Sequence, residues 1–517
     1  MSSLPFIGEL NGVPTLFVDN EPFFVLGGEL HNSSSSSLEY MEEKVWPYLR
    51  GLNMNTVVLP VAWEMVEAED GVFDFSLVDG LLNQARREGM RLVFLWFGLW
   101  KNSESNYVPG WMKRDADLFF RVEDGDGKRL NIVSPFCKAA VARDASAFER
   151  LMAHLRVVDG EDHTVIMVQV ENEIGVLGAD RDFSGEAQRL YEQPVPEGVL
   201  NAYGKSALAG QSWESVFGAD GPELFMAWGY AMAVEQITAT GRAIYPLPMY
   251  VNAWLVQHPW RPGTYPCGGP VMKVKTMWKH CAPSLFTMAP DIYDPHTADV
   301  MDEYTDTDNP LFIPEIRKDP VCASYMFYAF GKNNAIGISP FGIEDLLADP
   351  ADFEKPPMFL LMDLNIDVSA MDGSKTAPYL AAAYDMMAQL MPLYMEHRNT
   401  PRLQAFVQRE PNDNGIWLKF SRYDMVITYK HRQEGQPVGA GMVFELAPDQ
   451  FLCVGMNYKF EVYPKTGSRR QAVVGQAQEG TMVNGEFVQG RVLNGDERMN
   501  VNLNKMPSAL LVEIYDL

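Results

Sequence analysis

Long apolar segments and cysteine pairs are both missing from this sequence of 517 residues. No run of about 18 apolar residues without charge occurs, and Met1 to Pro5 lack a basic segment followed by an apolar one. The few cysteines form neither an even set nor a C-x-x-C pair, which argues against a disulfide framework or a compact zinc site; they are Cys137, Cys267, Cys281, Cys322 and Cys453. We therefore expect a soluble, cytoplasmic protein in a reducing compartment.

Basic residues are also scarce, since 42 Lys and Arg stand against 68 Asp and Glu, for a net charge of -26. Nucleic acids and anionic membranes both demand a positive surface, so neither is an expected partner. A neutral or cationic substrate is favoured. With 47% apolar and 21% charged residues the chain is typical of globular proteins, and its length predicts two or three domains.

The glycine motifs of nucleotide-binding folds are absent as well, because no GxGxxG follows a predicted strand and no GxxxxGK[ST] occurs. What the sequence does contain is a regular alternation of short apolar strands and amphipathic helices. We expect strands at 23–29, 52–59, 91–97, 165–171, 247–254, 284–289, 309–317 and 335–341. This alternation predicts an α/β fold, a (β/α)₈ TIM barrel over residues 1–397 with a long insertion near 176–222.

The pattern changes near residue 400. Short alternating runs at 416–420, 425–429, 458–463 and 510–515 are separated by turn signals such as Asp413-Asn414-Gly415 and Asn484-Gly485. Residues 398–517 are therefore predicted to form a smaller all-β, sandwich-like C-terminal domain.

Two glutamates follow predicted barrel strands. Glu173 comes directly after the fourth strand and Glu315 after the seventh. The carboxyl ends of barrel strands meet at one mouth, so the two side chains are expected to face each other there. Paired carboxylates in that position suit glycoside hydrolysis, with one attacking the anomeric carbon and the other protonating the leaving oxygen. The alternative is that an acidic residue at a strand end only caps the following helix.

Other strand-end residues are candidates for substrate binding. Glu29, Asn102 and Asn252 lie at the C-terminal ends of strands one, three and five, where contact with a sugar hydroxyl is favoured over a solvated loop role. Trp63 and Trp254 could stack on a sugar ring, although a buried tryptophan is as often part of the core.

Three further features of the sequence can be explained by structural roles. Glu171 shares a strand with Glu173 at a spacing of two, so it is either a partner that tunes the acid or part of a structural ion pair. The serine run 33–37 reads as a loop ending in a helix cap. The group Cys267, His280 and Cys281 matches no common metal spacing, and we predict no metal site.

The stretch Gln169-Val170-Glu171-Asn172-Glu173 resembles the acid/base motif of glycoside hydrolase family 35, the β-galactosidases of a large retaining clan built on (β/α)₈ barrels. Further segments are similar in the same order: 27–32, 62–75 and 309–315. The β-rich tail resembles the extra domain of a bacterial branch of this family. The turn at 98–102 differs from that of the longer-known members.

This resemblance implies roles for individual residues. Glu173 would be the general acid/base, Glu315 the nucleophile, and Asn172 a hydrogen-bond partner of the sugar 2-hydroxyl, with Tyr293 supplying an aromatic hydroxyl near the nucleophile. The implied activity is that of a retaining exo-β-glycosidase, foremost a β-galactosidase, on an oligosaccharide or β-galactoside, without a metal or organic cofactor. A transglycosidase, a β-glucosidase-like enzyme and a non-catalytic carbohydrate-binding protein are the alternatives, and the chain is a candidate homo-oligomer.

Overall fold

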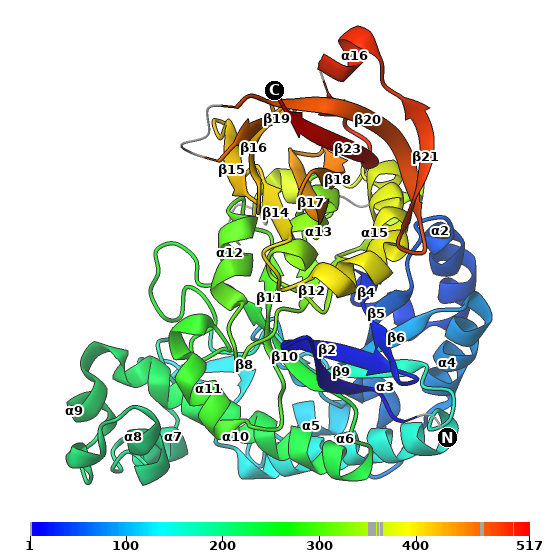
Figure 1. Cartoon of the computed structure of the whole chain (residues 1–517). Coiled ribbons are helices and arrows are strands. Elements are labelled where there is room, and N and C mark those ends of the chain that lie inside the picture. The colour runs from blue at the N-terminus through cyan, green and yellow to red at the C-terminus, as the bar shows by residue number, and fades with distance from the viewer. Residues whose placement is uncertain (1–2, 350–357, 359–360, 362–365, 466–469, 500) are drawn as a thin grey trace.

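A closed barrel of eight parallel strands forms the centre of the molecule (Figure 1). The computed structural model describes residues 3–349, 358, 361, 366–465, 470–499 and 501–517. The barrel strands are β4 (Val25–Glu29), β5 (Thr56–Ala62), β6 (Arg91–Lys101), β9 (Val165–Asn172), β10 (Met249–Trp254), β11 (Met288–Ile292), β12 (Ile313–Ile316) and β13 (Gly337–Pro340). Pairing of β13 with β4 closes the ring, which confirms the predicted (β/α)₈ fold.

Helices follow the strands in the expected order. The main ones are α4 (Ser76–Glu88), α6 (Lys138–Val158), α10 (Gly221–Ile244), α11 (Lys275–Cys281), α12 (Thr297–Tyr304), α13 (Cys322–Gly331) and α15 (Ala377–His397). The serine run ends where predicted, because the Ser37 hydroxyl accepts a hydrogen bond from the Tyr40 backbone N–H and caps α1 (Leu38–Tyr40). A π-helical turn, η2 (Met41–Val45), and α2 (Trp46–Leu49) continue this helix. Among the described helices, none is both long and apolar enough to span a bilayer.

The predicted C-terminal ends of two strands, each placed just before a proline, were wrong. We ended the second strand before Pro60 and the sixth before Pro290, yet both prolines lie inside strands, paired with Leu95 and Ala253. The Pro60 carbonyl accepts from the Ser35 hydroxyl at 2.6 Å, on a side of β5 where the ladder with β4 has already ended at Val58. No ladder bond is lost there, so a proline is tolerated near the end of a barrel strand.

The long insertion is more regular than its sequence indicated. It contains α7 (Gly185–Tyr191), α8 (Glu197–Ala202) and α9 (Trp213–Phe217), which lie beside α10 and α11 at one side of the barrel (Figure 1). Trp213 packs against Phe225 and Trp228 of α10 at ring-centroid distances of 5.5 and 5.6 Å. Aromatic contacts with α10 therefore hold these short helices, although their sequence has no sustained period.

A small N-terminal sheet was not predicted. Strands β1 (Phe6–Leu10), β2 (Val13–Val18) and β3 (Glu21–Phe23) pair antiparallel. Leu16 and Val18 of β2 share a buried cluster with Val25, Val58 and Val93, which lie early in three barrel strands. The sheet therefore covers the end of the barrel opposite to the strand C-termini.

The C-terminal region consists mainly of antiparallel strands, as predicted, and also contains one short helix, α16 (Gly495–Met499). One sheet has the order β14-β17-β18-β23-β20-β21 and the other β15-β16-β19-β22. Their bounds are β14 (Leu403–Val407), β15 (Gly415–Lys419), β16 (Tyr423–Tyr429), β17 (Ala440–Ala447), β18 (Gln450–Met456), β19 (Tyr458–Pro464), β20 (Ala472–Val483), β21 (Glu486–Val492), β22 (Asn502–Leu503) and β23 (Ser508–Asp516). The Asn484-Gly485 turn joins β20 to β21 with both residues at positive φ, as the dipeptide predicts.

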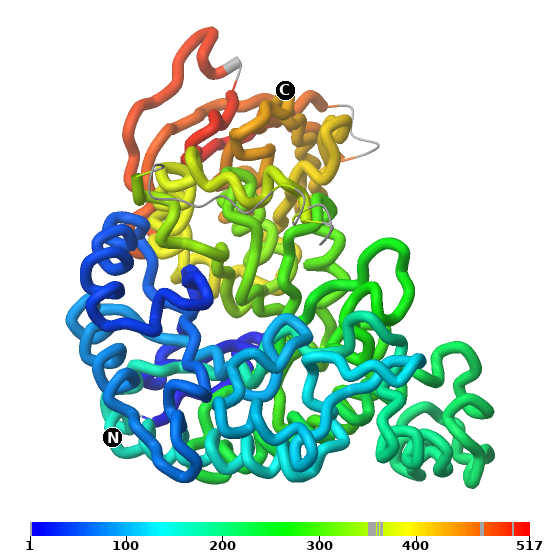
Figure 2. The backbone as a smooth tube through the Cα atoms, turned by 180° about the vertical axis from the view of Figure 1, so that it is seen from behind, coloured from blue at the N-terminus to red at the C-terminus, as the bar shows by residue number. Residues whose placement is uncertain are grey.

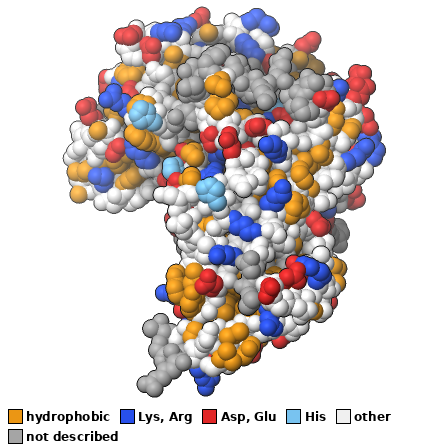
Figure 3. All heavy atoms as spheres, turned by 90° about the horizontal axis from the view of Figure 1, so that it is seen from above, with side chains coloured by type: hydrophobic (Ala, Val, Ile, Leu, Met, Phe, Trp, Pro, Cys, Tyr) orange, Lys and Arg blue, Asp and Glu red, His pale blue; other side chains and the backbone are white. Residues whose placement is uncertain are grey.

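The first of these sheets lies directly against the barrel helices α13 and α15 (Figure 2). A single buried apolar cluster contains barrel residues together with Leu403, Met442, Phe444 and Leu452 of the first sheet. At the tip of the β20–β21 hairpin, the Gly485 N–H donates to the Gln389 carbonyl of α15 at 2.7 Å. Seen from the side of this domain, acidic and basic side chains are interspersed on the surface (Figure 3).

Candidate active site

Four buried carboxyl groups gather at the C-terminal mouth of the barrel. Glu29 ends β4, Glu173 follows β9, Asp291 lies in β11 and Glu315 in β12, and each is less than a tenth exposed. One carboxylate oxygen from each of Glu173, Asp291 and Glu315 lies within 4.8 Å of the other two. The two glutamates singled out from the sequence therefore lie close together across the mouth.

A cavity opens over these groups. Its lining consists of strand-end residues and mouth loops: Asn32, Lys101, Asn102, Glu173, Trp254, Leu255, Val256, Gln257, Asp291, Tyr293, Asp294, Glu315, Phe341, Ile366 and Met371. Carboxyl and amide groups are thus combined with aromatic rings. This mixture suits a ligand that has both hydroxyl groups and an apolar face.

Glu173 is positioned by its backbone. Its φ of 46° is left-handed, and its N–H donates to Asn252 Oδ1 at 2.9 Å. Burial raises the pKa of the Glu173 carboxyl to about 7, and the nearby Glu315 contributes to the rise. Lys101 and a hydrogen bond with Asp291 lower the pKa in part. A carboxylic acid with this pKa is protonated in a substantial fraction of molecules near neutral pH.

Glu315 is held through one of its two oxygens. The Tyr293 hydroxyl donates a hydrogen bond to Glu315 Oε1. Burial and the adjacent Glu315 charge raise the pKa of Tyr293 well above its ordinary value, so the phenol stays protonated and remains a donor. No amide, hydroxyl or ammonium of the described residues donates to the buried Glu315 Oε2. A hydrogen bond between the Glu29 and Glu315 carboxyls contributes to the raised pKa of Glu29. Tyr293 therefore fixes one oxygen of Glu315, and Glu29 is the other carboxyl in contact with it.

Lys101 brings a positive charge into this acidic site. Its ammonium donates to Asn172 Oδ1 at 2.9 Å, and the lysine is only 6% exposed. This bond orients the Asn172 amide, whose buried Nδ2 has no partner within the described part of the chain. A donor left unpaired in a buried site favours a ligand that accepts a hydrogen bond.

Asp291 and Glu29 complete the polar ring. Asn252 Nδ2 donates to Asp291 Oδ2 at 2.6 Å. Burial raises the pKa of both Asp291 and Glu29 well above the ordinary range, and the negative charge of Glu315 is the second largest cause. This shift favours the protonated form of each carboxyl, which can donate a hydrogen bond. The oxygens of Glu173, Asp291 and Glu315 are close enough to share a cation, but the Lys101 ammonium already supplies positive charge beside them.

The remaining predicted residues fall into three groups. Asn102, Trp254 and Tyr293 line the cavity. Asn172, Asn252 and Glu29 lie in the buried layer around it. Trp63 does neither, and its predicted role in sugar stacking does not agree with the structure.

The position of Trp63 has a simple cause. It begins the short helix α3 (Trp63–Val66) and is fully buried. Its indole N–H donates to Glu67 Oε2 at 2.7 Å, and its ring packs between Trp96 and Trp111. The ring is thus part of the core outside the barrel strands.

Sequence reasoning missed Lys101, Asp291, Asn32 and Phe341 as lining residues. Lys101 was missed because β6 runs four residues beyond its predicted end, and Asp291 because the sixth strand was placed too early. The signal that could have found both is the one that marked Glu173, a charged residue at the C-terminal end of a barrel strand.

Glu171 has a structural contact with β6 instead of the cavity. Its carboxyl oxygens accept from the Trp100 N–H at 2.7 Å and the Leu99 N–H at 3.2 Å. Asp144 Oδ2 also accepts from Leu99, at 2.9 Å. Burial and the adjacent Asp144 raise the pKa of Glu171 well above its ordinary value. Glu171 therefore fixes the end of β6, from which Lys101 projects.

Two family models match the chain. Residues 15–236 match glycosyl hydrolases family 35, and residues 380–504 match a domain of unknown function, DUF5597. Among curated relatives, a β-galactosidase of Xanthomonas manihotis is 27% identical over 183 residues, which cover 34% of this chain and 28% of that protein. Beta-galactosidase-1-like protein 3 of Homo sapiens is 25% identical over 214 residues, which cover 39% of this chain and 30% of that protein. The aligned parts span less than a third of the length of these two relatives.

Similar solved structures include two β-galactosidases. That of Bacillus circulans sp. alkalophilus has a TM-score of 0.49 at 10% identity and covers 95% of this chain and 99% of its own. That of Rahnella sp. R3 has a TM-score of 0.48 at 14% identity, and the match covers 72% of this chain and 57% of the Rahnella enzyme. The chain is therefore similar to glycosyl hydrolases family 35 over residues 15–236, which include the first barrel strands, and to parts of two β-galactosidase relatives.

Proposed function

We propose that the protein is a retaining β-galactosidase that removes terminal β-galactosyl residues through a glycosyl-enzyme intermediate. The observation that carries this proposal is the close approach of Glu173 and Glu315, with carboxylate oxygens within 4.8 Å. Retaining glycosidases hold their two carboxyl groups about 5 to 5.5 Å apart, whereas inverting enzymes need about 6.5 to 9.5 Å to admit a water molecule. The separation supports retention.

In the first step Glu315 Oε2 attacks the anomeric carbon, and the bond to the leaving-group oxygen breaks. Glu173 gives its proton to that oxygen, so the leaving group departs as a neutral alcohol. Tyr293 holds the other oxygen of Glu315. The products of this step are a galactosyl ester on Glu315 and an ionised Glu173.

In the second step water attacks the anomeric carbon, Glu173 takes a proton from the water, and the ester bond to Glu315 breaks. Ester formation has removed the negative charge of Glu315, which is one cause of the raised pKa of Glu173. The pKa of Glu173 therefore falls in the intermediate, since the like charge beside it has gone. Glu173 is more readily protonated in the first step and remains ionised to act as a base in the second.

The surrounding groups support a neutral sugar as substrate. Asn172 Nδ2 has no hydrogen-bond partner among the described residues, and the raised pKa values of Glu29 and Asp291 favour protonated carboxyls that can donate to hydroxyl oxygens. Trp254 supplies an aromatic face. The choice of galactose draws on the names of the two curated relatives.

The test is hydrolysis of a panel of nitrophenyl β-galactoside, β-glucoside, β-fucoside and α-arabinoside. We expect the β-galactoside to be the best substrate, with the β-anomer as first product by NMR. Glu315→Gln should lower kcat by about 10⁴-fold or more, while Glu39→Gln on an exposed helix position serves as matched control. An inverted first product, or a Glu315→Gln variant with wild-type turnover, would refute the proposal.

A further inference from the structure

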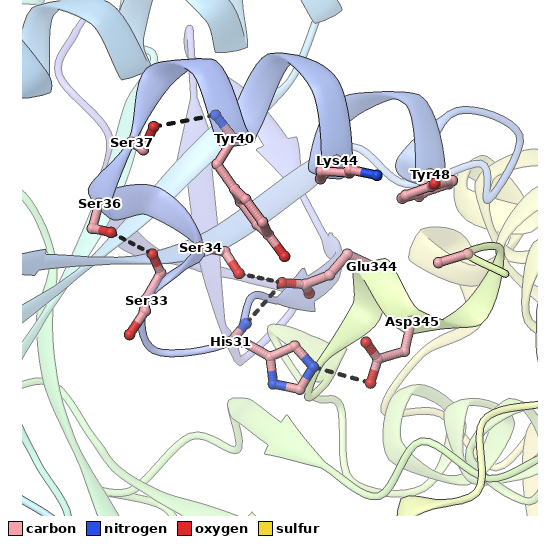
Figure 4. A pocket seen from close by; sticks show the side chains of 11 residues that line it. His31, Ser33, Ser34, Ser36, Ser37, Tyr40, Lys44, Tyr48, Glu344 and Asp345 are labelled. Atoms are coloured by element: carbon pink, nitrogen blue, oxygen red, sulfur yellow. Dashed lines mark hydrogen bonds and ion pairs between the residues drawn. The ribbon is translucent and has the colours of Figure 1, made fainter. Parts of the chain in front are cut away.

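A second and larger cavity lies at the same mouth, between the loop after β4 and the short helix η6 (Ile343–Leu346) that follows β13 (Figure 4). It encloses about 720 Å³. The serine run contributes Ser33, Ser34, Ser36 and Ser37 to its wall. The Ser34 hydroxyl donates to Glu344 Oε1 and the Ser36 hydroxyl to the Ser33 carbonyl, so these hydroxyl oxygens remain in the wall as acceptors.

The second cavity adjoins the catalytic one. Asn32 lines the catalytic cavity, and its chain neighbours His31 and Ser33 line the second. The His31 ring contacts Phe341 at a centroid distance of 5.2 Å, and Phe341 contacts Tyr293 at 6.4 Å. The rings of His31 and Phe341 therefore connect the wall of the second cavity to Tyr293, the partner of Glu315. A ligand longer than one sugar could therefore reach both cavities.

Glu344 supplies a buried acceptor to the second cavity. It is 5% exposed, and its Oε1 accepts from the His31 N–H at 3.0 Å and the Ser34 hydroxyl at 2.7 Å. Its other oxygen, Oε2, is buried without a hydrogen-bond partner among the described residues. An unpaired carboxylate oxygen is costly, so a hydroxyl donor on a bound ligand would be stabilised there.

The helix side of the cavity presents Tyr40, Lys44 and Tyr48, which are spaced four residues apart. The π-helical turn Met41–Val45 lies between the two tyrosines. Such turns are frequent at functional sites. Figure 4 shows the Tyr40 ring pointing from the helix toward Ser34 and Glu344. Phenol rings combine an apolar face with a polar hydroxyl, as a sugar ring also does.

The charges of this cavity indicate a neutral ligand. Asp345 accepts from His31 Nε2 at 3.0 Å and also pairs with Lys318, so its charge is already compensated. Lys44 and Glu344 are of opposite sign. Because no excess of either charge remains, polyhydroxylated neutral molecules fit better than anions or cations.

From these contacts we propose that the second cavity is a subsite for the leaving-group portion of a neutral oligosaccharide whose terminal sugar occupies the catalytic cavity. This inference rests on the proposed function. The unpaired Glu344 oxygen and the serine hydroxyls bind hydroxyl groups of the distal sugar, and Tyr48 contributes an apolar contact.

The test compares substrates with and without a distal sugar. For nitrophenyl β-galactoside and β-linked galacto-oligosaccharides of two to four units, kcat/KM is measured for the wild type, Tyr48→Ala and Glu344→Gln. Glu43→Ala, exposed on the same helix and outside the lining, is the matched control. We expect the ratio of kcat/KM for the longest oligosaccharide to that for the nitrophenyl substrate to fall about tenfold in both variants. The ratio should not change in the control.

Binding provides an independent readout. Calorimetric titration of the tetrasaccharide into Glu315→Gln should give a Kd that weakens about tenfold when Tyr48→Ala is added. If the wild type hydrolyses no glycoside, the proposed function fails, but loss of binding with Tyr48→Ala would still support the subsite. If the wild type hydrolyses galactosides and neither the ratio nor the Kd changes in the variants, the subsite is refuted and the function stands.

Discussion

At the level of single residues, Glu173 is subject to opposing electrostatic effects. Burial and the nearby Glu315 raise the pKa of its carboxyl to about 7, and Lys101 lowers it in part. The first catalytic step needs the protonated form, so kcat/KM should fall as pH rises above about 7, where Glu173 loses its proton. A pH profile of kcat/KM on nitrophenyl β-galactoside measures this. A profile that stays flat to pH 9 would contradict the assignment of Glu173 as the acid.

Lys101 gives a second prediction at this scale. Its positive charge stabilises the ionised form of Glu173, so its removal in Lys101→Met should raise the pKa of Glu173 further. The alkaline limb of the kcat/KM profile then moves to higher pH. Lys101→Arg keeps the charge and is the control, with a limb close to that of the wild type. A limb that moves to lower pH in Lys101→Met would contradict this electrostatic role.

At the level of elements, the end of β6 depends on a glycine. A Cβ on Gly98 would lie 2.4 Å from Asp144 Oδ2 and 2.5 Å from Glu171 Oε1, the two carboxyls that bind the β6 backbone. Gly98→Ala should therefore destabilise the fold by about 1–3 kcal/mol. It should also lower kcat, because Lys101 follows three residues later.

Urea unfolding and steady-state kinetics test this prediction. Gly185→Ala is the control, because a Cβ there meets no atom within 4 Å. An unchanged unfolding midpoint in Gly98→Ala would show that Asp144 and Glu171 can move aside without cost.

The strands show how far the sequence could be interpreted. Glu173 and Glu315 could be predicted as site residues because each is a carboxylate at the C-terminal end of a short apolar run. Because a proline is expected to break a strand ladder, the sequence predicts strand ends just before Pro60 and Pro290, whereas both prolines lie inside barrel strands and pair with Leu95 and Ala253. Trp63 could not be assigned, because the turn into α3 that buries its ring leaves no periodic signal.

At the level of the whole molecule, the C-terminal domain and the barrel share one apolar cluster. Phe444 of β17 is fully buried, and its ring packs against the His397 ring of α15 with the ring centroids 5.9 Å apart. Arg409, which follows β14, pairs with Asp302 of α12 at 2.6 Å. We expect both parts to unfold in a single calorimetric transition, since neither can lose its partner without exposing this cluster.

Phe444→Ala tests that coupling. Truncation of this core side chain should cost about 3–5 kcal/mol and lower the temperature at which the proposed activity on nitrophenyl β-galactoside is lost, although the site lies in the barrel. Ile416→Ala, at a position 41% exposed in the same domain, is the control and should leave that temperature unchanged. Two resolved transitions, or a Phe444→Ala variant that inactivates at the wild-type temperature, would show that the domains are independent.

The contact between the β20–β21 hairpin and Gln389 also affects the order of folding during synthesis. The helix α15 is complete about a hundred residues before Gly485 and the first sheet's later strands leave the ribosome. A growing chain folds from its N-terminal side as it emerges. The apolar face of α15 therefore stays exposed until the strands that cover it have been synthesised. Translation pauses between residues 400 and 510 would lengthen the time for which this apolar face is exposed. We expect such pauses to favour aggregation over completion of the fold.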